Sequence, residues 1–225
     1  MAALVRIQAL SGMAFAVFLS LHLANTVSAM FGQAAYDGLQ RLLRWYYQFP
    51  PVEIACVVGA ALVHVSAGIA RMKLRPRKAP GATIPWRVRL HRWSGYVLML
   101  LFAGHVTATR GPGLLLGVPA DFSYLTFSLG YWPLFFYPYY LVLFASGAWH
   151  LLNGVSTAAA VLAPGVRLSP AWAPVGAGVA VVCGLMGILA LGGNLFEVDT
   201  HRYAEFRALA DRFYPEWLRP WAVPP

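Results

Sequence analysis

Long apolar stretches, separated by short polar segments, dominate the pattern along the chain. A helix that spans a bilayer needs about 20 mostly apolar residues. Stretches of this length predict five membrane spans, at about residues 7–30, 51–71, 90–110, 134–161 and 172–194. The segment between the third and fourth spans holds glycines and prolines, and we expect an outer loop there, at 111–130. The sequence therefore predicts an all-α integral membrane protein, a bundle of five transmembrane helices.

The end of the chain has a different pattern. Its apolar residues recur every three to four positions, as in an amphipathic helix: Tyr203, Phe206, Ala210, Phe213 and Trp217. We expect two units, a transmembrane domain at 1–196 and an amphipathic tail at 197–225. A tail helix on the outer membrane surface and an ordinary solvated helix both fit this pattern.

Composition and charge support the membrane assignment. The chain has 225 residues, 59% hydrophobic and 11% charged, whereas soluble domains carry about 25% charge. Eight of its 17 basic residues, and no acidic residue, lie in 71–92. By the positive-inside rule this segment is cytoplasmic. The N-terminus is then inside and the C-terminus outside, in the inner (cytoplasmic) membrane. The net charge of +9 therefore indicates topology, and we expect no nucleic-acid partner.

Four histidines occur inside four different predicted spans, where an ionisable residue is costly and usually functional. His22 and His105 each follow a cytoplasmic arginine by sixteen residues, which is roughly 24 Å of helix. His64 and His150 lie in the inner half of their spans. Depth thus pairs His22 with His105 and His64 with His150. A single such histidine is as often a helix-packing residue, but two matched pairs predict axial ligands for two haem b groups.

The first and third spans begin alike. Arg6, Ser11-Gly12 and His22 have the same spacing as Arg89, Ser94-Gly95 and His105, 83 residues later. Two further histidines do not fit the pairs. His91 lies at the cytoplasmic start of the third span, suited to a haem propionate, a partner protein or simply the interface. His201 lies in the tail, and the sequence assigns it no role.

The four-histidine layout resembles the cytochrome b membrane subunit of succinate:quinone oxidoreductase and fumarate reductase, in its single-subunit, two-haem form. His91-Arg92-Trp93-Ser94-Gly95 looks like the His-Arg-x-Ser/Thr-Gly motif of that family, and His150-Leu151-Leu152-Asn153-Gly154 is similar to its fourth-helix ligand region. The resemblance covers about 1–194, and the tail departs from it. It implies electron transfer between succinate and a membrane quinone, usually menaquinone. An iron–sulfur subunit and a flavoprotein subunit would dock on the cytoplasmic face, and a trimer of complexes stays open.

Several polar residues are candidates for supporting roles in such a protein. Arg89 and Arg92 would neutralise propionates of the inner haem or contact the iron–sulfur subunit, unless they only set topology. Glu53, the one carboxylate placed inside a predicted span, would relay protons to a quinone, or would merely begin its helix. Arg92, Trp93 and Ser94 are alternative quinone contacts. The expected partners of the outer propionates are basic or aromatic: Arg41, Arg44, Arg110 and the tyrosines of 45–47.

Two other classes of protein compete with this interpretation. The membrane cytochromes of hydrogenase, formate dehydrogenase and nitrate reductase also use two haems, although they more often place two ligands on one helix. A haem-free scaffold or small transporter would leave the histidines to helix packing, and paired inverted repeats would favour a transporter. The repeat here has parallel sense.

Overall fold

The computed structural model describes residues 2–74, 83–166 and 168–213. Within these ranges the chain forms helices and no strands, which confirms the all-α class. The elements, in order, are α1 (Ala2–Ser28), η1 (Ala29–Phe31), α2 (Gln33–Tyr47), α3 (Pro50–Val52), η2 (Glu53–Gly59), α4 (Ala60–Lys73), α5 (Trp86–Leu116), α6 (Phe122–Tyr131), α7 (Pro133–Leu162), α8 (Trp172–Leu191) and α9 (Tyr203–Phe213).

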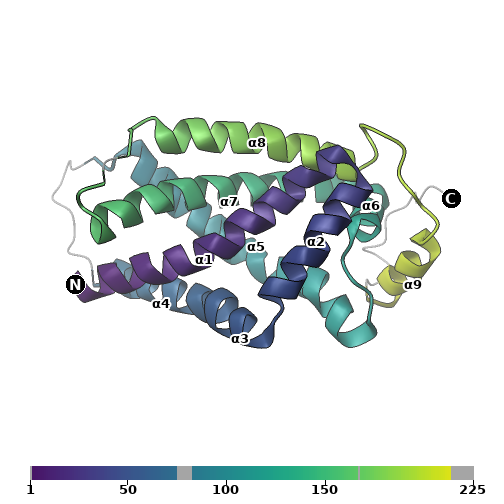
Figure 1. Ribbon diagram of the computed structural model, residues 1–225, viewed down its shortest axis with the longest axis horizontal. Coiled ribbons are helices and arrows are strands. Elements are labelled where there is room, and N and C mark those ends of the chain that lie inside the picture. The colour runs from purple at the N-terminus through teal and green to yellow at the C-terminus, as the bar shows by residue number, and fades with distance from the viewer. Residues whose placement is uncertain (1, 75–82, 167, 214–225) are drawn as a thin grey trace.

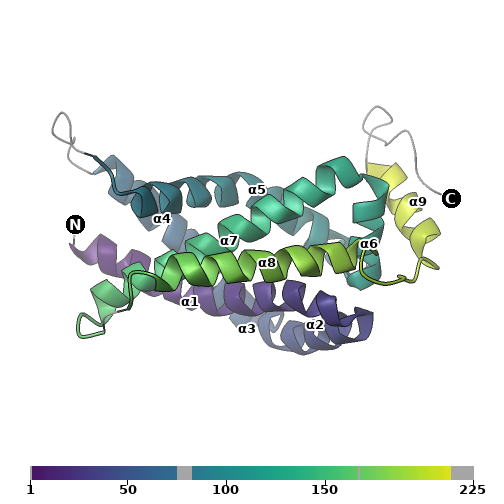
Figure 2. The ribbon, with the colours of Figure 1, turned by 90° about the horizontal axis from the view of Figure 1, so that it is seen from above.

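The long helices form an elongated bundle. α7 packs against α8, α1 and α5, and α1 also packs against α4 and α8. The helices α2, α6 and α9 lie toward one end, which we call the α6 end (Figure 1, Figure 2). At the opposite end α1, α5 and α8 begin and α4 and α7 finish. This end carries most of the described cations of the long helices, and we call it the basic end: Arg6, Arg71, Lys73, Arg87, Arg89 and Arg92.

Among the described residues, three helical segments are long and apolar enough to span a membrane: Ala2–Phe31, Pro50–Lys73 and Trp172–Leu191. The second of these is continuous through α3, η2 and α4, and η2 is a π-helix. A side-chain Cβ at Gly59 would lie 2.8 Å from the carbonyl oxygen of Ile54, so the wider turn leaves no room for a larger residue. α5 and α7 have 31 and 30 residues, but they are not among these three segments. For these two helices, spanning stays a prediction.

The expected outer loop at 111–130 is wrong in detail. α5 continues to Leu116, and it ends where Gly117 takes a left-handed conformation with φ of 69°. α6 then begins at Phe122, after the carboxylate of Asp121 accepts a hydrogen bond from the backbone N–H of Tyr124 at 3.0 Å. This N-cap satisfies an amide that the first helical turn leaves unpaired. The segment is therefore largely helical.

Glycines of α8 let this helix approach its neighbours. A Cβ at Gly187 would lie 2.2 Å from the carbonyl oxygen of Thr26 in α1, and a Cβ at Gly184 would lie 2.2 Å from the ring of Phe144 in α7. Both contacts are closer than any side chain permits, so the packing of α8 depends on these residues. Small residues at helix contacts are typical of membrane bundles.

The amphipathic tail forms α9, and its apolar face covers α6. Phe206 is 1% exposed and packs with Phe127 and Tyr131 of α6. Arg202 joins the two elements, because its guanidinium lies 2.6 Å from the carboxylate of Asp121. Trp217 and the rest of 214–225 lie outside the described residues.

Candidate functional site

The structure brings the four span histidines together in the two pairs that their depth predicts. The rings of His22 in α1 and His105 in α5 have centroids 5.7 Å apart, at an interplanar angle of 72°. The rings of His64 in α4 and His150 in α7 have centroids 6.1 Å apart, at 88°. We call these the outer pair and the inner pair.

Each pair joins helices that face one another across the bundle. Neither α1 with α5 nor α4 with α7 is among the closely packed helix pairs of the described chain. The two histidines of a pair thus meet through their side chains, whereas the packed contacts run between α1 and α4, α1 and α7, and α5 and α7. A planar group held between two such side chains would lie inside the bundle.

The separation within each pair fits two imidazoles on opposite sides of one metal ion. An imidazole nitrogen binds a first-row metal at about 2 Å, which puts the centroids of two opposed rings roughly 6 Å apart. The observed 5.7 and 6.1 Å agree with this value. Within the described ranges no three His, Cys, Asp or Glu side chains gather as ligands for one ion. A haem iron needs only two axial ligands from the protein.

Backbone carbonyls orient the rings of the inner pair. Nδ1 of His64 lies 2.9 Å from the carbonyl oxygen of Gln8, and Nδ1 of His150 lies 3.2 Å from that of His91. A carbonyl oxygen only accepts, so each Nδ1 carries the proton and each Nε2 keeps its lone pair. Metal-binding histidines usually have such an outer partner. In the outer pair, Nδ1 of His105 is buried with no hydrogen-bond partner among the described residues.

Two glycines make room for the inner pair. A Cβ at Gly12 would lie 2.7 Å from Nδ1 of His64, and a Cβ at Gly95 would lie 3.0 Å from Cε1 of His150. Both values are below an ordinary contact distance, so each ring rests on a glycine backbone. This gives a structural reason for the two Ser-Gly pairs that begin the first and third spans.

The repeat seen in the sequence extends to these contacts. Gln8 and His91 are 83 residues apart, like Gly12 and Gly95, and each supplies the carbonyl for an inner-pair histidine. The histidine-bearing helices match as well, since His64 and His150 are each followed four residues later by a glycine. A Cβ at the first of these, Gly68, would meet the side chain of Gln8 at 2.8 Å; a Cβ at the second, Gly154, would meet that of His91 at 3.5 Å. The two halves of the bundle thus build the same local arrangement.

His91 is closer to the site than the sequence indicates. Its ring stacks on that of His150, with centroids 4.0 Å apart and planes 10° from parallel. The sequence left its role open between a propionate, a partner and the interface. The signal that could have placed it is the match with Gln8, which holds the corresponding position beside His64. His201, in contrast, lies away from both pairs and bonds the exposed Asp199 at 2.6 Å.

The other predicted residues of the basic end differ in their contacts. Ser94 is 5% exposed, and its hydroxyl lies 2.9 Å from the carbonyl oxygen of His91 and 3.2 Å from Nδ1 of His150. This serine supports the inner pair. Arg92 is half-buried and Arg89 is exposed at the start of α5. Three further cations of the basic segment lie outside the described residues: Arg75, Arg77 and Lys78.

Glu53 is not an isolated carboxylate. Its two oxygens accept hydrogen bonds from Nε and Nη2 of Arg110, at 3.0 and 3.1 Å. This bidentate geometry is the strong form of a carboxylate–guanidinium pair, and both side chains are less than a third exposed. Sequence reasoning treated the two residues separately, because nothing local connects positions 57 apart.

Two arginines line a cavity close to the outer pair. Arg44 and Arg110 line a cavity of about 190 Å³ together with Thr109. The hydroxyl of Thr109 donates to the carbonyl oxygen of His105 at 2.7 Å, so this cavity lies one helical turn from the outer pair. A cavity of this kind suits the carboxylates of a group bound between His22 and His105.

Comparison of the chain with protein-family models, with curated proteins and with solved structures gave no match. The geometry of the two pairs therefore carries the functional argument.

Proposed function

We propose that this protein is a dihaem cytochrome b that carries electrons through a membrane. The observation that carries the proposal is the pairing itself: two histidine pairs at different depths, each with ring centroids about 6 Å apart and each joining helices on opposite sides of the bundle. One such contact is common in helix packing. Two of them, between the histidines that the residue counts pair, favour two bound haem b groups.

The chain's own residues have distinct tasks in this proposal. His22 and His105 would hold the outer haem iron, and His64 and His150 the inner one. Gln8, through its carbonyl group, fixes the tautomer of one inner ligand. The haems supply one-electron redox chemistry, and the protein tunes them through ligand orientation and burial. The arginines beside the outer pair would compensate haem carboxylates.

The topology proposed is five spans, with the basic end in the cytoplasm. α5 and α7 lie in one bundle with the three segments that are apolar enough to span. Both also carry paired histidines, which belong at the same depths as their partners. The described acidic residues, from Asp37 to Asp211, lie in segments away from the basic end. The location that this orientation implies is the inner membrane of a cell.

The proposed partners follow from the resemblance to succinate:quinone oxidoreductase. An iron–sulfur subunit and a flavoprotein subunit would dock at the basic end, where Arg89 is exposed. The electron acceptor or donor in the membrane would be a quinone, with menaquinone expected. Glu53 remains the proposed proton relay at the outer side, now acting as one member of an ion pair with Arg110.

Reduction of the haems by candidate substrates tests this function. The protein would be purified in mild detergent with the subunits that accompany it, and its α-band absorbance followed after adding succinate, formate or hydrogen. Of these three substrates, only succinate should reduce the haems. A quinol analogue should also reduce them when no succinate is present. Reduction by formate or hydrogen instead would assign the chain to another respiratory dehydrogenase.

A further inference from the structure

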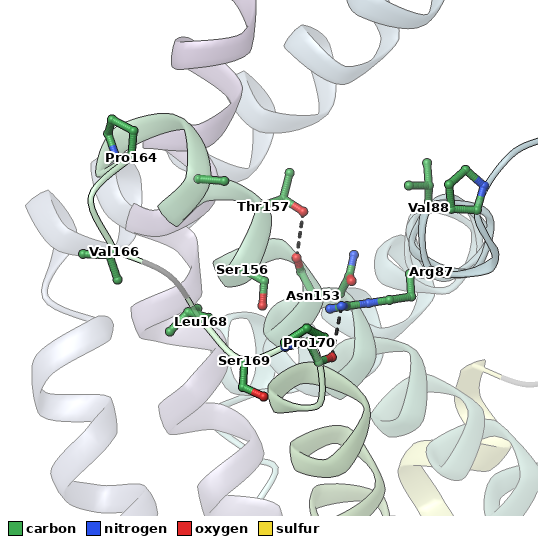
Figure 3. A pocket seen from close by; sticks show the side chains of 12 residues that line it. Arg87, Val88, Asn153, Ser156, Thr157, Pro164, Val166, Leu168, Ser169 and Pro170 are labelled. Carbon is green, nitrogen blue, oxygen red and sulfur yellow. Dashed lines mark hydrogen bonds between the residues drawn. The ribbon is translucent and has the colours of Figure 1, made fainter.

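A second cavity lies at the basic end, outside both histidine pairs. Its volume is about 820 Å³, within the range of small-molecule sites. The start of α5, the last turns of α7 and the connection from α7 to α8 form its walls (Figure 3). Nothing in the proposed electron path uses this space.

Positive charge and hydrogen-bond donors mark one side of the cavity. The side chain of Arg87 reaches across it beside Asn153, and its Nη1 donates to the carbonyl oxygen of Pro170 at 3.1 Å (Figure 3). Nε of Arg87 is buried without a partner among the described residues. None of the described lining residues is acidic. A ligand with an anionic, acceptor-rich group would complete this arrangement.

The first turn of α5 adds to the positive potential. Pro85 precedes the helix, and no side chain of the described residues caps it. The N–H groups of a first helical turn lack acceptors within the helix, and the helix dipole places partial positive charge there. Pro85, and Arg87 and Val88 of this turn, line the cavity. Dipole and guanidinium thus face the same space, which favours a phosphate group.

The connection from α7 to α8 gives the cavity a largely apolar wall. Val166, Leu168 and Pro170 line it together with Ser169, two to six residues before α8 begins at Trp172. α8 is one of the segments apolar enough to span, so in the proposed topology its first residue lies near the level of the lipid headgroups. A free aqueous anion would gain nothing from this wall, whereas a lipid has apolar chains beside its phosphate.

We propose that this cavity binds the headgroup of an anionic phospholipid, with the phosphate against Arg87 and the chains leaving along the apolar wall. Basic pockets between membrane helices on the cytoplasmic side are suited to such lipids. The inference concerns a site separate from the haem ligands, and it holds whether or not the chain carries haem.

Lipid binding by matched variants tests the proposal. Native mass spectrometry in detergent would compare phosphatidylglycerol with phosphatidylcholine on the wild type, Arg87→Gln and Lys73→Gln. Both substitutions remove one charge from the basic end, but Lys73 does not line the cavity. Loss of one charge-assisted contact should weaken phosphatidylglycerol binding roughly tenfold in Arg87→Gln. Lys73→Gln should bind like the wild type, and Arg87→Lys, which keeps the charge, should lie between Arg87→Gln and the wild type.

Two further measurements distinguish a bound lipid from a free anion or a quinone in this cavity. Inorganic phosphate at millimolar concentration should not displace the lipid, and displacement would make this a site for a free anion. Solvent extraction should release the same amount of quinone from the wild type as from Arg87→Gln. A quinone that is present in the wild type and lost only in Arg87→Gln would overturn the proposal. Equal weakening by both glutamine variants would also overturn it, because it would indicate general surface charge. Unchanged haem content in all variants keeps this test independent of the proposed function.

Discussion

Substitution of Gly12 by alanine tests the support of the inner pair. The new Cβ would lie 2.7 Å from Nδ1 of His64, whereas ordinary contacts begin at 3.4 Å. The imidazole must therefore move by roughly 0.7 Å, the difference between these two distances. Metal–ligand distances tolerate only about 0.2 Å. The shift also strains the hydrogen bond from Nδ1 to the carbonyl oxygen of Gln8. We expect Gly12→Ala to lose the inner haem and to keep the outer one.

The corresponding change in the other half of the bundle should be milder. At Gly95 the Cβ would lie 3.0 Å from His150, so a movement of roughly 0.4 Å restores ordinary contact. We expect Gly95→Ala to retain inner haem with a shifted midpoint potential. Gly178→Ala is the control, since its Cβ would enter open space on α8.

The assay is a haem count by pyridine haemochrome, with a potentiometric titration that resolves the two haems. Haem content should fall from about two per chain towards about one in Gly12→Ala, and thermal unfolding should show that the chain is still folded. Full haem content with unchanged potentials in Gly12→Ala would refute the role assigned to this contact. Loss of the outer haem alone would refute the placement of the pairs.

Three other changes probe separate parts of the structure. His64→Ala should remove the inner haem and spare much of the outer one, and His22→Ala should do the reverse; equal loss of both in each variant, in low-temperature spectra, would argue against the pairing. Glu53→Gln should slow quinone turnover with the haem spectrum intact, and unchanged turnover would end the assignment of Glu53 as proton relay. The same change should lower the free energy of unfolding in detergent by roughly 1–2 kcal/mol, because Arg110 loses its ion-pair partner. The hydrogen bonds from Arg202 lower the pKa of Glu205, so their contribution to α9 is present above the unfolded pKa of about 4.3 and is lost as pH falls. The hydrogen-exchange protection factors of the α9 amides, which correct for the pH dependence of intrinsic exchange, should therefore fall below about pH 4, and a fall of the same size in Arg202→Gln would contradict this cause.

Periodicity and residue spacing predict much of this molecule because the bilayer restricts what a chain can do. Long apolar stretches must be helical, since no water is present to satisfy the backbone. Depth along a helix is fixed by its rise, so counting residues from Arg6 and Arg89 matches His22 with His105. His64 lies close to Arg71 and His150 lies late in an inward-running span, which matches these two. The structure brings these histidines together as predicted.

The features that the sequence did not predict depend on contacts between segments that are far apart in the chain. The ion pair of Glu53 with Arg110 joins η2 to α5, and no local pattern in the sequence predicts it. α6 was missed because its helix depends on the Asp121 cap and on cover from α9 rather than on a long apolar run. The stacking of His91 on His150 was within reach of the sequence through the repeat, but only after Gln8 had been shown to hold the equivalent place.

The central claim is that the chain binds two haems through the two histidine pairs. A dithionite-reduced minus oxidised spectrum of the purified, folded chain, with haem counted by pyridine haemochrome, tests it most directly. Two b haems per chain are predicted, each lost separately when its own histidine pair is altered. Folded protein that carries no haem would contradict the claim and would return the four histidines to helix packing.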